Sequence, residues 1–188
     1  TTSAADAMER VAIVGSPGSG KSTLARTLSS ATGLRHVELD GLWHRPGWTN
    51  PTVPEFRLQV AEELTDGGWV VDGNYRTVQD IVNGSADTIV WIDLPRRQVT
   101  ARVIRRSVWR VLTRKELWAG NRETLRTLFS RDPRQNMVAW TWTHHPKYRQ
   151  LYSMLAHDGT WDHAAVWHLR TPADVRHLVR WTERRHTA

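Results

Sequence analysis

Short apolar segments alternate along the chain with longer segments whose apolar residues recur every three or four positions. Residues 11–14 form a short apolar run that ends at Gly15, which is typical of a buried strand. Residues 21 to about 32 then carry apolar side chains at helical spacing, and Gly33 ends that pattern. Residues 11–32 therefore predict a strand, a connecting loop and a helix.

The same alternation continues toward the C-terminus. Further strands are expected at about residues 36–39, 69–72, 88–92 and 165–169. Helices are expected from Pro54 to about Leu64, over much of 96–156, and from Thr171-Pro172 onward. Strands that alternate with helices predict an α/β fold, in which a parallel sheet carries helices on both faces. Ligands of such folds bind at the carboxyl ends of the strands.

Length and composition predict one globular domain. The chain has 188 residues, of which 39% are hydrophobic and 24% charged, values typical of a folded protein. We expect a flexible tail over residues 1–9 and a single domain over 10–188. The chain has no cysteine, and it has neither a signal-peptide pattern before Met8 nor a window of 18 apolar residues. A cytoplasmic protein without membrane association is the expectation.

The loop after the first expected strand carries the strongest motif. It fits G-x-x-x-x-G-K-[ST] in full, between a strand and a helix as the motif requires. Backbone N–H groups of such a loop surround phosphate oxygens, its lysine reaches the β- and γ-phosphates, and its serine hydroxyl binds Mg²⁺. The motif comprises Gly15, Ser16, Pro17, Gly18, Ser19, Gly20, Lys21 and Ser22.

The basic residues are mostly arginines. The net charge is +7, and only Lys21, Lys115 and Lys147 among the 26 basic side chains are lysines. Arginine suits phosphate oxygens, so this balance indicates an anionic partner such as a nucleotide or nucleic acid. A genomic bias toward arginine codons on a solvated surface explains the composition equally well. The positions of the arginines along the chain must therefore distinguish an anionic partner from a codon bias.

The motif of residues 15–22 is a P-loop. Together with later segments it makes the chain resemble the small P-loop phosphotransferases of the adenylate kinase and shikimate kinase group, over about residues 10–180. Within that group it looks most like the adenylate kinase-like proteins that are labelled DNA topology modulation proteins. The later matches are individually weak but occur in order. The matching segments are 15–23, 38–44, 69–76, 91–95, Arg102 with Arg106, and 118–123.

The resemblance implies a five-stranded parallel sheet with ATP and Mg²⁺ at the P-loop, extended by Thr23. Arg102 and Arg106 have the spacing after Pro95 that such kinases use to grip the nucleotide. The two arginines lie one helical turn apart, so their like charges repel unless an anion lies over them. A solvated arginine face is the alternative. Thr171-Pro172 corresponds to the region that packs against adenine in this group.

An acceptor site is expected after the second and third strands. Asp40 can bind an acceptor hydroxyl, although it can also cap its turn with Gly41. Asp72 matches the acid that orients Mg²⁺ in the family, together with Ser22. Where nucleotide kinases follow Asp-Gly with Phe-Pro-Arg, this chain has Asn74-Tyr75-Arg76, which keeps the arginine and changes the pocket. We assign acceptor contacts to Asp40, Trp43, Arg45, Asn74 and Arg76.

The resemblance also implies a lid, which we place at about residues 107–130. Arg122 and Arg126 lie one turn apart on an expected helix and would return to the transferred phosphoryl group. Trp118 would report closure. Asp93 follows the fourth strand and is expected to be a helix cap or a structural acid.

The sequence thus predicts an ATP- and Mg²⁺-dependent phosphotransferase whose catalytic residues are Lys21, Asp40, Arg102, Arg106 and Arg122, with a small metabolite or nucleotide as acceptor. A nucleic-acid-associated protein that uses ATP as a switch is the less favoured alternative, because no DNA- or RNA-binding motif supports it. A nucleotide-binding protein with slow hydrolysis is a third interpretation.

Overall fold

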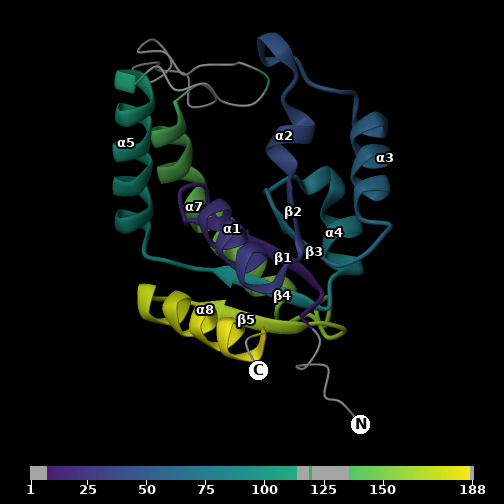
Figure 1. The fold of residues 1–188 in the computed structure, drawn as a ribbon. Helices are drawn as coiled ribbons and strands as arrows, with labels where there is room; N and C mark the ends of the chain where they lie inside the picture. Colours follow the sequence, from purple (N-terminus) through teal and green to yellow (C-terminus); the bar gives the residue numbers. More distant parts are fainter. Residues whose placement is uncertain (1–7, 114–118, 120–135, 187–188) are drawn as a thin grey trace.

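The computed structural model describes residues 8–113, 119 and 136–186, and the rest of the chain lies outside the described part (Figure 1). Five parallel strands form one sheet in the order β2-β3-β1-β4-β5. The predicted α/β fold with a five-stranded parallel sheet is therefore confirmed. The strands are β1 (Arg10–Gly15), β2 (Arg35–Glu38), β3 (Trp69–Asp72), β4 (Thr88–Ile92) and β5 (Ala165–Leu169).

Helices connect the strands where the periodicity predicts them, and two further short helices, at residues 39–43 and 79–85, were not predicted. In Figure 1, α5 and α7 stand on one side of the molecule, α2 and α3 on the other, and α8 lies along β5. The helices are α1 (Lys21–Thr32), α2 (Leu39–Trp43), α3 (Val53–Glu63), α4 (Gln79–Ser85), α5 (Arg96–Thr113), α7 (Met137–Leu155) and α8 (Pro172–His186), with short 3-10 helices η2 (Pro46–Trp48) and η3 (Arg76–Val78).

The core has two halves, one on each face of the sheet. Alternate side chains of a strand point to opposite faces, so Ala12 and Val14 of β1 face α3, α4 and α7, whereas Val11 and Ile13 face α1 and α8. All four are buried. Helices on both faces therefore bury residues 11–15 of the central strand, as a parallel sheet requires.

Local sequence explains where the helices begin and end. Thr52 and Glu55 form a capping box at the start of α3, in which each side chain binds the other residue's backbone N–H. Gly33 ends α1 with a φ of 74° and donates its N–H to the Ser29 carbonyl. These short-range contacts fix the helix boundaries close to the predicted positions.

The N-terminal end of the domain begins slightly earlier than the expected tail of residues 1–9 allows. Residues 1–7 of the expected tail lie outside the described residues. Met8 is buried, and the N–H of Glu9 donates to Asp87 Oδ2 over 3.1 Å, so these two residues belong to the folded domain. None of the described helices combines the length and apolar character needed to cross a membrane.

Candidate functional site

The carboxyl ends of β1 and β3 lie side by side and carry the predicted nucleotide-binding residues. In the register of the sheet, Ile13 of β1 pairs with Asp72 of β3, and Gly15 pairs with Ile92 of β4. The P-loop therefore leaves the centre of the sheet next to Asp72. This arrangement follows from the strand order, which places β3 and β4 on either side of β1.

The P-loop is held tightly between β1 and α5. Gly18 has a φ of +78°, and a Cβ atom there would lie 2.3 Å from Val103 Cγ2 and 3.0 Å from the Val99 carbonyl oxygen. Only glycine permits both this backbone conformation and this approach of α5. The side chains of Ser16 and Ser19 are buried within the loop.

Lys21 lies folded against the loop. Its Nζ donates hydrogen bonds to the carbonyl oxygens of Gly15 (2.9 Å) and Ser16 (3.1 Å). Burial lowers the pKa of Lys21 to about 8, and the nearby Arg106 also lowers it. The carboxylates of Asp72 and Asp40 act in the opposite direction and raise it. The ammonium group of Lys21 is therefore partly buried, and Asp72 and Asp40 are the acidic side chains that act on it.

The loop fits a phosphate chain. The hydroxyl oxygen of Ser19 is buried and has no hydrogen-bond partner among the described residues, so a polar ligand would satisfy it. The first N–H groups of α1, which begins at Lys21, offer donors and the positive end of the helix dipole. Residues 15–22 together could hold the phosphates of ATP.

Arg102 and Arg106 both lie on α5, the helix that approaches the P-loop at Gly18. Arg102 Nη1 donates to the Ser19 carbonyl oxygen over 3.0 Å, which ties α5 to the P-loop. Arg106 is close enough to Lys21 to lower its pKa. Three basic groups therefore converge on the P-loop, which favours a polyanionic ligand over a solvated arginine face.

Asp72 and Ser22 carry the oxygen atoms that the sequence analysis assigned to Mg²⁺. Asp72 is the last residue of β3 and is 3% exposed, and its charge raises the pKa of Lys21. Ser22 is the second residue of α1. His36 of β2 lies 2.8 Å from Asp72, measured from Nε2 to Oδ1, and so holds one carboxylate oxygen. The donor set of hydroxyl and carboxylate oxygens suits Mg²⁺.

Asp40 does not end the second strand as expected. β2 ends at Glu38, and Asp40 lies in the first turn of α2. Its Oδ1 accepts a 2.6 Å hydrogen bond from the hydroxyl of Tyr75. The backbone at Gly73, whose φ is +140° and where a Cβ would lie 2.6 Å from Leu39 Cβ, brings the chain after β3 close to α2. Tyr75 can therefore reach Asp40.

The other residues expected to bind acceptor on this side have structural partners. The ring of Trp43 packs 4.9 Å from Phe56 and 5.4 Å from Tyr75, between ring centroids. Trp43, the last residue of α2, therefore packs against Tyr75 together with Phe56 of α3. Arg45 Nη2 lies 3.9 Å from Glu55 Oε2 on the surface, where its charge is balanced.

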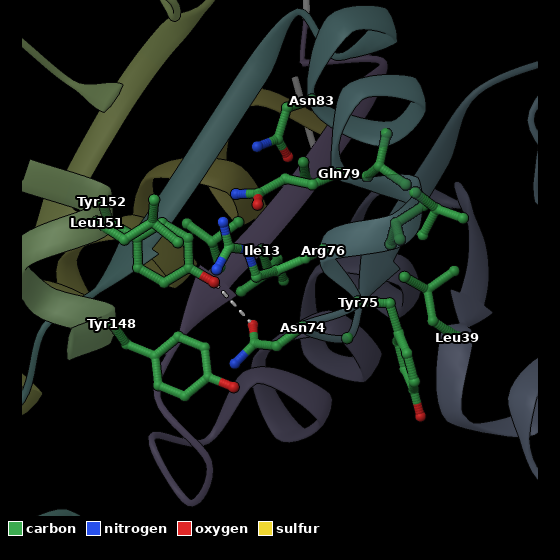
Figure 2. Close-up of a pocket in the computed structure, with 16 residues that line it drawn as sticks. Ile13, Leu39, Asn74, Tyr75, Arg76, Gln79, Asn83, Tyr148, Leu151 and Tyr152 are labelled. Atoms are coloured by element: carbon green, nitrogen blue, oxygen red, sulfur yellow. Dashed lines mark hydrogen bonds between the residues drawn. The ribbon is translucent and has the colours of Figure 1, made fainter. Parts of the chain in front are cut away.

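A narrow cavity opens between the end of β3, α4 and α7 (Figure 2). Its volume is about 20 Å³, which is room for about one water molecule. Arg76 and Asn74 point into it from one side, and Tyr148 and Tyr152 from the other. Gln79 also lines the cavity, and its Nε2 is buried without a hydrogen-bond partner among the described residues.

Asn74 connects this cavity to the P-loop. Its Nδ2 donates a hydrogen bond to the Gly15 carbonyl oxygen, and its Oδ1 accepts one from the Tyr152 hydroxyl over 3.1 Å. Arg76, in contrast, is largely exposed. Of the two residues expected to contact acceptor here, Arg76 keeps its guanidinium at the cavity, whereas the amide of Asn74 is engaged at both ends.

Two further expectations concern the adenine contact of Thr171-Pro172, which stays a prediction, and the lid. Thr171 caps α8, because its N–H donates to Asp174 Oδ2 and its Oγ1 accepts from the Asp174 N–H, and Pro172 is the first residue of that helix. Arg122, Arg126, Trp118 and most of the expected lid lie outside the described residues.

Sequence reasoning missed four residues of this region. His36 and Tyr75 are held against the predicted acids Asp72 and Asp40, and Tyr148 and Tyr152 line the cavity from α7. The signal for Tyr75 was the departure from the family's Phe-Pro pair. The two α7 tyrosines stand four residues apart, which puts them on one helical face, but nothing local shows that this face meets the P-loop.

Comparisons with known proteins agree with the fold. The structure is similar to a gluconokinase from Sinorhizobium meliloti 1021, with a TM-score of 0.51 and 16% identity over 96% of this chain and 92% of that one. A shikimate kinase from Acinetobacter baumannii gives 0.50 and 16% over 93% and 90%. A deoxyadenosine kinase from M. mycoides gives 0.51 and 14% over 92% and 98%.

The similarity is one of structure. No protein-family model matches the chain, and no curated protein matches its sequence. The three solved structures cover nearly the whole chain and nearly the whole of their own chains. The chain has the fold of the P-loop kinases.

Proposed function

We propose that this protein is an ATP- and Mg²⁺-dependent phosphotransferase that moves the γ-phosphoryl group to a hydroxyl group of a small metabolite or nucleotide. The observation that supports the proposal is the partly buried Lys21, whose Nζ donates hydrogen bonds to the carbonyl oxygens of Gly15 and Ser16 and whose pKa is affected by Asp72, Asp40 and Arg106. An ammonium group that is bound to loop carbonyls can exchange them for phosphate oxygens.

The nucleotide side uses residues of the P-loop and α5. Backbone N–H groups of residues 15–22 and the N-terminus of α1 would bind the phosphates. Lys21, Arg102 and Arg106 would neutralise the charge that spreads over the transferred group. Phosphoryl transfer needs little covalent chemistry from the protein, so positioning of the reactants and neutralisation of charge are sufficient for catalysis.

Mg²⁺ would be held by Ser22 and, directly or through water, by Asp72. The ion supplies charge neutralisation between the phosphate oxygens. His36 contacts Oδ1 of Asp72 over 2.8 Å and fixes the direction of that carboxylate. We assign these residues to the metal on the chemistry of their donor atoms.

The acceptor side would lie between α2 and the cavity. Asp40 would accept a hydrogen bond from the attacking hydroxyl, and Arg76 would bind a polar or anionic group of the acceptor. The cavity of about 20 Å³ is smaller than any metabolite, so the acceptor must widen the space between Arg76 and the α7 tyrosines when it binds.

The experiment that tests the proposal mixes the protein with ATP, Mg²⁺ and a library of hydroxylated metabolites and nucleotides. Phosphorylated product is detected by ³¹P NMR or mass spectrometry, with Lys21→Met as control and a DNA-binding assay at stated salt beside it. A product formed by the wild type and lost in the control supports the proposal. Salt-sensitive DNA binding without any product would favour the nucleic-acid alternative.

A further inference from the structure

The carbonyl oxygen of Gly15 accepts hydrogen bonds from two side chains. One donor is Lys21 Nζ at 2.9 Å, and the other is Asn74 Nδ2. Gly15 is buried at the end of β1, so water does not readily replace a lost donor. A carbonyl oxygen has two lone pairs, so it can accept both hydrogen bonds, and one donor remains when the other leaves.

Asn74 is itself held in one orientation. The hydroxyl of Tyr152 donates to Asn74 Oδ1 over 3.1 Å, as the dashed line in Figure 2 shows. Tyr152 is 3% exposed, and burial raises the pKa of its hydroxyl, which therefore remains a donor at neutral pH. Because the amide oxygen is engaged by a donor, the amide nitrogen must face Gly15.

Nucleotide binding changes the demands on this carbonyl. On the proposed function, Lys21 leaves the Gly15 and Ser16 carbonyls to reach phosphate. A buried carbonyl that lost its only donor would cost about tenfold to a hundredfold in affinity. The second donor removes that cost at Gly15.

We propose that Asn74 is a positioning residue that keeps the Gly15 carbonyl hydrogen-bonded when Lys21 turns to the nucleotide phosphates, with Tyr152 holding the amide in register. The inference rests on the proposed function. It gives Asn74 a role at the P-loop in place of the acceptor contact expected from the sequence. It also makes α7, through Tyr152, part of the nucleotide-binding machinery.

The test is a double-mutant cycle between Asn74 and Lys21. Affinities for MgATP and for Mg-tripolyphosphate are measured by calorimetry for the wild type, Asn74→Leu, Lys21→Met and the double variant. We expect Asn74→Leu to weaken binding at least tenfold in the wild type and by less than twofold in the Lys21→Met background. A merely structural role would lower affinity equally in both backgrounds, and that result would overturn the inference.

Tyr152→Phe is the milder second variant, since it removes one hydroxyl and keeps the ring. It should weaken MgATP binding about threefold, again only when Lys21 is present, and an unchanged affinity would contradict the role given to Tyr152. Gln150→Leu serves as the matched control, because Gln150 is an exposed amide on the same helix. Its affinity should equal that of the wild type.

The outcomes separate the two claims. If the wild type binds no MgATP and Lys21→Met makes no difference, the proposed function fails and the inference fails with it. If the wild type binds MgATP and transfers phosphate while the cycle is additive, only the role of Asn74 is wrong.

Discussion

The hydroxyl of Tyr75 donates a 2.6 Å hydrogen bond to Oδ1 of Asp40, and this contact joins the chain after β3 to the first turn of α2. Burial, with Asp40 as the next cause, raises the pKa of Tyr75, so the hydroxyl stays protonated and donates. The ring of Tyr75 packs 5.1 Å from Phe56 and 5.4 Å from Trp43, between centroids. An aromatic cluster therefore aims the carboxylate of Asp40.

Tyr75→Phe should separate orientation of Asp40 from packing. The substitution keeps the ring and removes a hydrogen bond to a charged group, so kcat/KM for acceptor should fall about 10- to 100-fold. Affinity for MgATP should stay near the wild-type value. Steady-state kinetics with varied acceptor measure the effect, and the same loss in an Asp40→Asn background would show that Tyr75 does not act through Asp40.

Lys21 predicts a pH dependence of nucleotide binding. Its pKa in the free protein is about 8 because it is buried, and bound phosphate favours the charged form and raises that pKa. Binding above pH 8 therefore takes up a proton, so affinity for MgATP should fall about tenfold per pH unit above pH 8. Below pH 8 the lysine is already charged and the slope should flatten.

Calorimetric titrations between pH 7.5 and pH 9.5 measure this slope. Lys21→Arg provides the control, because a guanidinium stays charged across this range, and whatever affinity it retains should be nearly independent of pH. A wild-type affinity as flat as that of the arginine variant would contradict the assignment of Lys21 to the phosphates.

Gly18→Ala should damage both the P-loop and the fold. A left-handed backbone costs an alanine about 1–2 kcal/mol, and the contact of its Cβ with Val103 at 2.3 Å adds an overpacking cost of about 1–3 kcal/mol. We expect the free energy of unfolding to drop by about 2–5 kcal/mol in urea denaturation. Gly84→Ala is the control, because a Cβ at that position of α4 meets nothing within 4 Å.

Gly84→Ala should be neutral or stabilising by up to about 1 kcal/mol, since alanine favours helix. The double variant Gly18→Ala, Val103→Ala relieves the clash with Val103 while the backbone cost remains, so it should recover only part of the loss. Equal stabilities for the two single variants would show that the close approach of α5 to the P-loop is not maintained in solution.

A buried carboxylate outside the nucleotide site predicts a pH dependence of stability. Asp93 Oδ2 lies 3.1 Å from Arg149 Nε and 3.2 Å from His168 Nε2, and His168 stacks on Trp91 with 3.8 Å between ring centroids. This placement agrees with the structural role expected for Asp93. Burial lowers the pKa of His168 below its ordinary 6.5, and Asp93 offsets only part of that effect.

The unfolded chain therefore binds more protons at His168 than the folded protein does between the lowered pKa and pH 6.5. Stability should fall as the pH drops through this window. His168→Gln keeps a donor for Asp93 and removes the titration, so its free energy of unfolding should decline less between pH 7 and pH 5. His157→Gln, which changes an exposed histidine, should retain the wild-type decline. Identical declines in all three proteins would contradict the lowered pKa.

Much of the fold could be predicted from the sequence, because the signals are short-range. The apolar runs of β1 and β4, the helical spacing that Gly33 ends and the P-loop of residues 15–22 each depend on residues a few positions apart. Their structures are formed by neighbours in the chain. The alternation of these elements was enough to predict the parallel sheet and to put the P-loop at its carboxyl edge.

The contacts that define the site depend on the tertiary structure. Tyr75 meets Asp40, Asn74 meets Gly15 and Tyr152 meets Asn74 across 35, 59 and 78 positions of the chain. These pairings follow from the strand order β2-β3-β1-β4-β5, which no local pattern encodes. The sequence alone therefore determined which residues could bind phosphate. Only the packing of α2 and α7 against the ends of β1 and β3 decided which side chains hold them in place, because burial leaves each polar group dependent on the partners that the fold brings within reach.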